Sequence, residues 1–185
     1  MKNTEINEVI LVNLSDEVIG SMEKLEAHEK GLLHRAFSVL LFNSKKELLL
    51  QKRALGKYHS EGLWTNTCCS HPSPGESIIE AANRRLMEEM GLNCTLQNSF
   101  SFVYKIALDN NLIEHEFDHV VIGKCDIDPV LNAKEASDYS WVSLTQIQSE
   151  MALNPDKYTS WFKIIIGEHF EKLNESIKTL FNESL

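Results

Sequence analysis

Two thiols and an imidazole lie close together near the middle of the chain, at Cys68, Cys69 and His71. A helix-like stretch follows them, and it carries two arginines and two glutamates at positions 84, 85, 88 and 89. Thiols, imidazoles and carboxylates transfer protons, carboxylates also bind divalent cations, and guanidinium groups bind anions. This set of residues therefore indicates proton transfer, metal binding and an anionic substrate.

The stretch from Ser70 to Leu92 resembles the Nudix box when it is read back from Gly91. The positions that agree with that pattern are Glu76, Arg84, Glu88, Glu89, Gly91 and Leu92. Two positions depart from it, because Ser70 replaces the leading glycine and Arg85 replaces the central glutamate. With Thr-Asn-Thr-Cys-Cys-Ser-His-Pro at residues 65–72, these departures resemble the isopentenyl-diphosphate delta-isomerase family of the Nudix-like type.

The composition is that of a soluble globular protein. The chain has 185 residues, of which 43% are hydrophobic and 24% are charged, so we expect one domain over residues 1–185. The net charge of −9 argues against nucleic-acid or acidic-membrane binding. We find no apolar run of bilayer length and no signal-peptide pattern. The four cysteines show no disulfide framework and no CxxC zinc spacing, so we expect a cytoplasmic protein.

The hydrophobic pattern predicts strands mixed with helices. We expect strands at residues 8–12, 36–42, 47–51, 100–106, 114–124 and 139–142, with a turn at 15–20 and a loop at 28–33. The strands and helices do not alternate regularly, so the fold class is an α/β sandwich or α+β. The resemblance implies the Nudix fold specifically, with mixed sheets sandwiched by helices.

Three helices are predicted from their start signals. Ser73-Pro74-Gly75-Glu76 has capping-box spacing with proline at the first helical position, and Gly91 ends the helix that it opens. Ser143 repeats the capping-box pattern and opens a second helix. Asn154-Pro155 starts a third helix, which is amphipathic to residue 180.

A divalent metal site is the first constellation that the resemblance implies. Glu114 and Glu116 are two residues apart in a predicted strand, so both carboxylates lie on one face. His28, His34 and His71 come from other segments, and any one of them alone is more often a solvated or hydrogen-bonded side chain. In their sequence contexts, all five look like the family's metal ligands. Three nitrogens and two carboxylates suit octahedral Mn²⁺, Mg²⁺ or Zn²⁺.

A pair of proton-transfer groups is the second constellation. The family places its catalytic thiol directly before Ser/Gly-His-Pro, which selects Cys69. The family's substrate is an isolated alkene, so one group must protonate it to a tertiary carbocation and another must remove a neighbouring proton. Cys69 and Glu116 look like these two groups. Tyr104 is similar to a tyrosine that hydrogen-bonds the glutamate, and we weigh this equally with a strand tyrosine whose hydroxyl lies in water. The remaining thiols are expected to be packing residues: Cys68, Cys94 and Cys125.

An anion-binding set completes the implied site. Arg85 is its strongest member, because a Nudix hydrolase holds a catalytic glutamate at that place. Glu89 resembles the residue that holds a Mg²⁺ ion bridging the substrate phosphates. Trp161 is the family-like aromatic group that stabilises the carbocation, although a helix tryptophan is more often simply core. The positions that match the family's diphosphate-binding residues are Lys24, Arg53, Lys57 and Arg85.

One segment departs from the family pattern. Residues 58–62 lack the aromatic-proline pair that is common before Gly-x-Trp, which leaves the path of this segment and the role of Lys57 open.

Three functions are compatible with these motifs. The first is an isomerase that interconverts isopentenyl and dimethylallyl diphosphate, with a small diphosphate substrate and an open oligomeric state. The second is a Nudix hydrolase of a nucleoside diphosphate derivative, which needs a carboxylate at Arg85 and has no need of Cys69. The third is a Nudix-like binding module with a structural metal, which leaves the pair of Cys69 and Glu116 unexplained.

Overall fold

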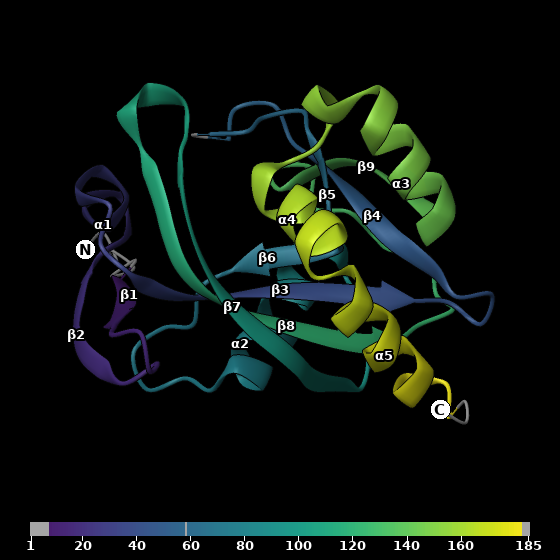
Figure 1. Ribbon diagram of the computed structural model, residues 1–185, viewed down its shortest axis with the longest axis horizontal. Coiled ribbons are helices and arrows are strands. Elements are labelled where there is room, and N and C mark those ends of the chain that lie inside the picture. The colour runs from purple at the N-terminus through teal and green to yellow at the C-terminus, as the bar shows by residue number, and fades with distance from the viewer. Residues whose placement is uncertain (1–7, 58, 183–185) are drawn as a thin grey trace.

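The computed structural model describes residues 8–57 and 59–182, so Tyr58, one of the residues in the predicted atypical segment, lies outside the described part (Figure 1). The described strands belong to one connected sheet. They are β1 (Glu8–Val12), β2 (Val18–Glu23), β3 (His34–Phe42), β4 (Glu47–Arg53), β5 (Trp64–Thr65), β6 (Cys68–Ser70), β7 (Leu96–Ala107), β8 (Ile113–Lys124) and β9 (Ala136–Ser143). The helices are α1 (Lys24–Lys30), α2 (Ile78–Met90), α3 (Leu144–Leu153), α4 (Ser160–Glu168) and α5 (Phe170–Leu180).

Strand β3 lies at the centre of the sheet. It pairs antiparallel with β1, β4 and β6, and it pairs parallel with β8 along its whole length. Strand β8 pairs on its other side with β7 in an antiparallel ladder. Two apolar runs far apart in sequence are therefore neighbours in the middle of the molecule.

Helices cover both faces of this sheet. In Figure 1, α5 lies in front of β3 and β8, and α2 lies behind them. Side chains alternate along β3, so Leu40 and Phe42 pack with α3, α4 and α5, whereas Val39 and Leu41 pack with α2. The predicted fold class is confirmed: a single domain in which a mixed sheet is sandwiched by helices.

The predicted turn at residues 15–20 and loop at 28–33 are partly wrong. Strand β2 begins at Val18 and is almost entirely exposed. Hydrogen bonds to β1 form this strand. Because neither of its faces is buried, its sequence does not alternate between apolar and polar residues. Helix α1 has only seven residues and buries only Ala27 and His28. A helix this short shows too few apolar positions for periodicity to reveal it. It ends at Gly31, which adopts the left-handed conformation with φ 59°.

Helix α2 begins later than its predicted cap. Ser77 is the N-cap and forms a complete capping box with Glu80, so the helix starts at Ile78. Ser73 donates its backbone N–H to Glu76, but Gly75 has φ 86°, which is incompatible with a helix interior. The spacing of Ser73 and Glu76 therefore marks a turn that precedes the helix, and it does not mark the helix cap. The predicted end at Gly91 is confirmed, with φ 64°.

The predicted single helix after Pro155 is divided. A short 3₁₀ turn at Pro155–Lys157 comes first, and α4 and α5 follow on either side of His169, whose backbone is not helical. The break lets α4 bury Trp161 and α5 bury Leu173 in the same core. The predicted second helix is confirmed, with Ser143 as its N-cap.

Two glycine substitutions test the end of α2. In Gly91→Ala the new methyl group lies 2.8 Å from the carbonyl oxygen of Val130, and the left-handed backbone adds about 1–2 kcal/mol of strain. We expect a loss of at least about 2 kcal/mol in the free energy of unfolding, measured by urea denaturation. Gly167→Ala is the matched control in α4, where no atom lies within 4 Å of the new methyl group. The free energy of unfolding of Gly167→Ala should rise by about 0.5–1 kcal/mol. Equal stability of the two variants would contradict this account of the helix end.

Candidate metal centre and active site

The register of four strands brings the predicted site residues together. His34 on β3 pairs with Glu116 on β8, and Tyr104 on β7 pairs with Glu116 from the other side. Cys69 on β6 pairs with Ser38 on β3. Directly paired residues on neighbouring strands have Cβ atoms about 4.5–5.5 Å apart, so the backbone ladder itself places these side chains in contact range.

Four potential metal ligands converge beside this ladder. Ligand atoms of His28, His34, His71 and Glu116 all lie within 4.8 Å of one another. His71 Nε2 lies 2.9 Å from Glu116 Oε1 and 3.2 Å from His34 Nε2. His34 Nε2 lies 3.5 Å from the same carboxylate oxygen. These atoms form a compact set of imidazole and carboxylate donors.

Backbone carbonyls orient two of these rings. His28 Nδ1 lies 2.7 Å from the carbonyl oxygen of Lys24, and His34 Nδ1 lies 2.8 Å from that of Leu32. Each ring therefore donates its Nδ1–H outward and presents the Nε2 lone pair to the group, which is the usual arrangement of metal-binding histidines. Burial lowers the pKa of His28 and lowers that of His71 to about 3, so both rings are neutral at pH 7. The residues present fit a divalent metal ion.

Glu114 lies beside this group rather than within it. It is on the same buried face of β8 as Glu116, and its own group contains His28 and His59. Burial and the nearby Glu116 charge raise the pKa of Glu114. Burial alone would also raise the pKa of Glu116, but interactions with His34 and His71 outweigh it and lower that pKa. The pKa values of the two carboxyl groups are therefore shifted in opposite directions.

Tyr104 connects the two carboxyl groups. Its hydroxyl donates to Glu116 Oε2 at 2.5 Å and lies 3.2 Å from Glu114 Oε2. The side chain is only 7% exposed, so the structure favours the hydrogen-bonded alternative over a hydroxyl in water. Burial and the two glutamates raise the pKa of Tyr104, which keeps the hydroxyl protonated as a donor.

The adjacent cysteines face opposite sides of β6. Cys68 is fully buried and packs in the core on the side of α2. Cys69 is half-buried and lines the cavity that contains Tyr104 and Glu116. Burial raises the pKa of Cys69 to about 12, so its thiol stays protonated at neutral pH. Strand alternation thus gives two neighbouring thiols different surroundings.

One cavity, partly open to solvent, unites the site. Except for His28 and His34, every predicted site residue lines it. Those that do are Lys24, Arg53, Lys57, Cys69, His71, Arg85, Glu89, Tyr104, Glu114, Glu116 and Trp161. Trp161 is 3% exposed and belongs to the core as well, donating its Nε1–H to Asn66. The two alternatives for this tryptophan are therefore not exclusive.

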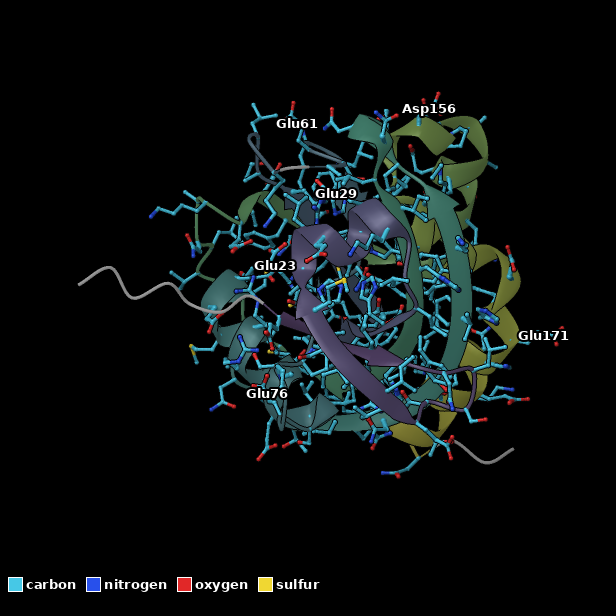
Figure 2. All side chains as sticks on the ribbon, turned by 90° about the vertical axis from the view of Figure 1, so that its left-hand side faces the viewer. Glu23, Glu29, Glu61, Glu76, Asp156 and Glu171 are labelled. Carbon is cyan, nitrogen blue, oxygen red and sulfur yellow. The ribbon has the colours of Figure 1, made fainter. Side chains whose placement is uncertain are left out.

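Four basic residues line the cavity of this acidic protein, together with four glutamates. Lys24, Arg53, Lys57 and Arg85 all line the cavity, whereas labelled carboxylates such as Glu61, Asp156 and Glu171 project from the periphery (Figure 2). Burial, followed by the charges of Lys57 and Arg85, lowers the pKa of Lys24. An anionic ligand entering the cavity would relieve this repulsion, so the arrangement suits a diphosphate.

Glu135 is a cavity residue that the sequence analysis missed. Its carboxylate accepts from Lys57 Nζ at 2.5 Å and from Arg85 Nη2 at 3.1 Å. The same Arg85 nitrogen donates to Glu89 Oε1 at 2.8 Å. Glu135 comes from the segment before β9, far from both cations in sequence, and no motif marks it. It holds Lys57 against Arg85, which gives the atypical segment a defined attachment.

His59 is the second missed residue. It is buried in the cavity wall, and its Nε2 atom lies 3.6 Å from Glu114 Oε1. Its position within the atypical segment was the one available signal.

Comparisons with known proteins agree with this geometry. The family model of the NUDIX domain matches residues 32–162. Isopentenyl-diphosphate Delta-isomerase 2 of Photorhabdus laumondii is 52% identical over 90% of this chain and 95% of its own length. Isopentenyl-diphosphate Delta-isomerase of Pectobacterium atrosepticum is 52% identical over 86% and 89%. The chain belongs to the isopentenyl-diphosphate Delta-isomerase family.

Solved structures support the fold of this isomerase family member. DR0079 from Deinococcus radiodurans has a TM-score of 0.65 at 20% identity, covering 79% of this chain and 89% of its own. MutT from Methanosarcina mazei has a TM-score of 0.63 at 23% identity, covering 77% and 96%. These likenesses concern the fold alone. The named relatives support the isomerase interpretation over the Nudix hydrolase alternative. Within the described residues, no helix is long and apolar enough to cross a membrane.

Metal binding should stabilise this isomerase family member. We expect Mn²⁺ at 100 times its dissociation constant to raise the free energy of unfolding by about 2.7 kcal/mol. Because His71 contacts both His34 and Glu116, His71→Ala should lose most of this gain in a thermal-shift titration. His115→Ala is the control, since His115 lies on the other face of β8 and contacts Gly31. An equal metal-dependent shift in both variants would place the ion elsewhere.

Proposed function

We propose that this protein interconverts isopentenyl diphosphate and dimethylallyl diphosphate by adding and removing protons at carbon. The observation that supports this most is the convergence of three chemistries in one cavity. A thiol at Cys69, a hydrogen-bonded carboxyl at Glu116 and a cationic set around Arg85 all line it. An alkenyl diphosphate needs an acid, a base and an anion-binding end.

The two reacting carbons would lie between Cys69 and Glu116. One of these groups adds a proton to the terminal alkene carbon, which moves the positive charge to the tertiary carbon. The other group removes a proton from the neighbouring carbon on the diphosphate side, and the double bond forms there. Because the reaction is reversible, each group acts as acid in one direction and as base in the other. Tyr104 holds the Glu116 carboxylate in place through its 2.5 Å hydrogen bond.

The carbocation must be protected from water while it exists. Trp161 offers an aromatic face in the cavity wall, which attracts a cation by its negative quadrupole. The Arg53 guanidinium carbon lies 5.3 Å from the centroid of this ring and fixes the tryptophan from one side. Arg53 also holds the carbonyl groups of His59 and Ser60, so it closes the wall beside the tryptophan.

The diphosphate would bind at the cationic end of the cavity. Arg85, Lys57 and Lys24 supply the positive charge, and Glu135 aligns the first two. Glu89 would hold a Mg²⁺ ion that bridges the phosphates, and its buried carboxylate is already aligned by Arg85 and Gln51. The ion would supply charge neutralisation. The ion of the His/Glu group would be Mn²⁺, Mg²⁺ or Zn²⁺ and would hold Glu116 in place.

The remaining alternatives have less support. A Nudix hydrolase needs a metal-binding carboxylate at position 85. Here Arg85 stands there instead, and its guanidinium group is bound to Glu89. A binding module with a structural metal does not need a thiol beside Glu116.

We also propose a cytoplasmic location, since Cys68, Cys69, Cys94 and Cys125 are all free thiols. Incubation of the purified protein with isopentenyl diphosphate and Mg²⁺ should form an acid-labile allylic diphosphate. No product from an otherwise folded, metal-loaded protein would refute the isomerase proposal.

Arg85 and its neighbour Arg84 give a matched test of the anion site. Arg85 lies in the cavity, whereas Arg84 is bound to Glu76 near the surface. Arg85→Gln should weaken diphosphate binding by about 2–5 kcal/mol, as expected when one member of a desolvated charge pair is removed. Arg84→Gln should bind normally in calorimetry with inorganic diphosphate and Mg²⁺. Unchanged binding in Arg85→Gln would place this residue outside the site.

The adjacent thiols give the sharpest test of the chemistry. Cys69→Ser replaces the thiol by a much poorer acid of similar shape, so turnover should fall by about 10²–10⁴ while fold and metal binding remain. Cys68→Ser buries a hydroxyl in the core and should cost stability with little effect on turnover. The rate of allylic product formation measures the first effect and urea denaturation the second. Full turnover in Cys69→Ser with none in Cys68→Ser would reverse the assignment.

A further inference from the structure

Backbone hydrogen bonds hold His59 in the cavity wall. It lies in the connection between β4 and β5, and its side chain is 5% exposed. Arg53 donates to the carbonyl oxygen of His59 and to that of Ser60, both at 3.1 Å. Ser60 has φ 50°, a left-handed conformation that is uncommon for residues other than glycine. The backbone is thus bent and fastened so that this imidazole points inward.

The imidazole contacts groups of the metal centre rather than only apolar neighbours. Its Nε2 atom lies 3.6 Å from Glu114 Oε1, and its ring faces that of His28 at an interplanar angle of 28°, with centroids 6.2 Å apart. Ligand atoms of His28, His59 and Glu114 all lie within 4.8 Å of one another. A separation of 3.6 Å is too long for a hydrogen bond, so direct bonding to Glu114 does not explain the pairing.

The donor atoms fall into two triads. The first triad is His34, His71 and Glu116, with separations of 3.2, 2.9 and 3.5 Å. The second is His28, His59 and Glu114, and His28 is also within reach of the first. Metal–donor bonds of about 2.1 Å give octahedral edges of about 3 Å. The two groups of donor atoms share His28, so the second group adjoins the first, and an ion bound by both would draw the six donors together.

We propose that His59 is a ligand of the metal centre, so that one ion is bound by four imidazoles and two carboxylates. This set adds a ligand to the five that the family resemblance implies. The inference rests on the metal centre of the proposed function, but it does not depend on the isomerase activity.

The surroundings of His59 favour the ligating form of its ring. Nδ1 lies 3.2 Å from Ser60 Oγ, and when Nδ1–H donates to this oxygen the Nε2 lone pair points toward Glu114 and His28. His28 and His34 are oriented in the same way by carbonyl oxygens. Burial and the Arg53 charge lower the pKa of His59 to about 3, so the ring is neutral.

Six protein donors would leave no open position on the ion. Catalytic metal sites keep such a position for water or substrate, whereas closed sites are structural. The ion bound by His59 would therefore act by holding Glu114 and Glu116, and it would not activate a water molecule that captures the carbocation.

Counting histidine ligands tests the proposal without an activity assay. In the Co²⁺-substituted protein, each ligand imidazole bound through Nε2 gives one paramagnetically shifted, solvent-exchangeable Nδ1–H resonance in proton NMR. We expect four such resonances in the wild type, three in His59→Ala and four in the His115→Ala control. Calorimetry with Mn²⁺ should show at least about tenfold weaker binding in His59→Ala only.

Other results of the same experiments distinguish the ligand role of His59 from the existence of the metal centre and from the isomerase activity. Three resonances in the wild type that persist in His59→Ala would overturn the proposal, even if Mn²⁺ affinity falls, because His59 would then only support a ligand. The wild-type count decides this even if His59→Ala fails to fold. No shifted resonance and no calorimetric binding in the wild type would refute the metal centre itself. The isomerase assay on the same wild-type preparation reports separately on the proposed function.

Discussion

The parallel pairing of β3 with β8 is the constraint on which the rest of the structure depends. It sets His34 beside Glu116, and the neighbouring β7 ladder sets Tyr104 on the other side of the same glutamate. A slip of one residue would turn every side chain of β8 to the opposite face. Glu114 and Glu116 would then leave the cavity, and Val121 would leave its core. The apolar packing that fixes the register therefore also fixes the metal centre.

The cost of this arrangement is the burial of charge. Three carboxyl groups follow one another on the inner face of β8, and each raises the cost of ionising the next. Asp118 shows the effect most clearly: burial and the Glu116 charge raise its pKa to about 8, so it stays protonated at neutral pH and accepts from Ser38. Interactions with His34 and His71 lower the pKa of Glu116, which favours its negative charge. A divalent cation bound there would offset the remaining charge.

At the opposite end of the cavity, positive charges lie close together. Arg85 and Lys57 are held together although they carry the same charge, and Glu135 makes this stable by accepting from both. Glu89 is bound by the same arginine and by Gln51. The cavity thus has a cationic end and a carboxylate-imidazole end, with Cys69 and Trp161 between the polar groups and the core. An amphipathic anion with a short hydrocarbon part matches this polarity.

The family resemblance predicted most of the residues that line the cavity, and the hydrophobic pattern predicted the fold class. The histidines, the paired glutamates, Cys69 and Arg85 stand in local sequence patterns, and the long buried strands and helix α2 show clear periodicity. Short or exposed elements escaped prediction. Strand β2 is formed by pairing rather than burial, α1 has too few turns, and Ser73 and Ser77 offer the same capping pattern four residues apart. Only the φ angle of Gly75 decides between the two serines.

By itself, the sequence determined which chemical groups are present and which of them share a strand face, because alternation and capping depend on near neighbours. Tertiary structure decided which groups meet across long sequence separations. His59 reaches Glu114 and Glu135 reaches Lys57 only because the chain folds back, and neither contact leaves a periodic or local signal. The division of the ligands between two triads is likewise a property of the β3–β8 register and of the fastened segment after β4. Contacts of this kind depend on the packing of the whole sheet, which no window of sequence contains.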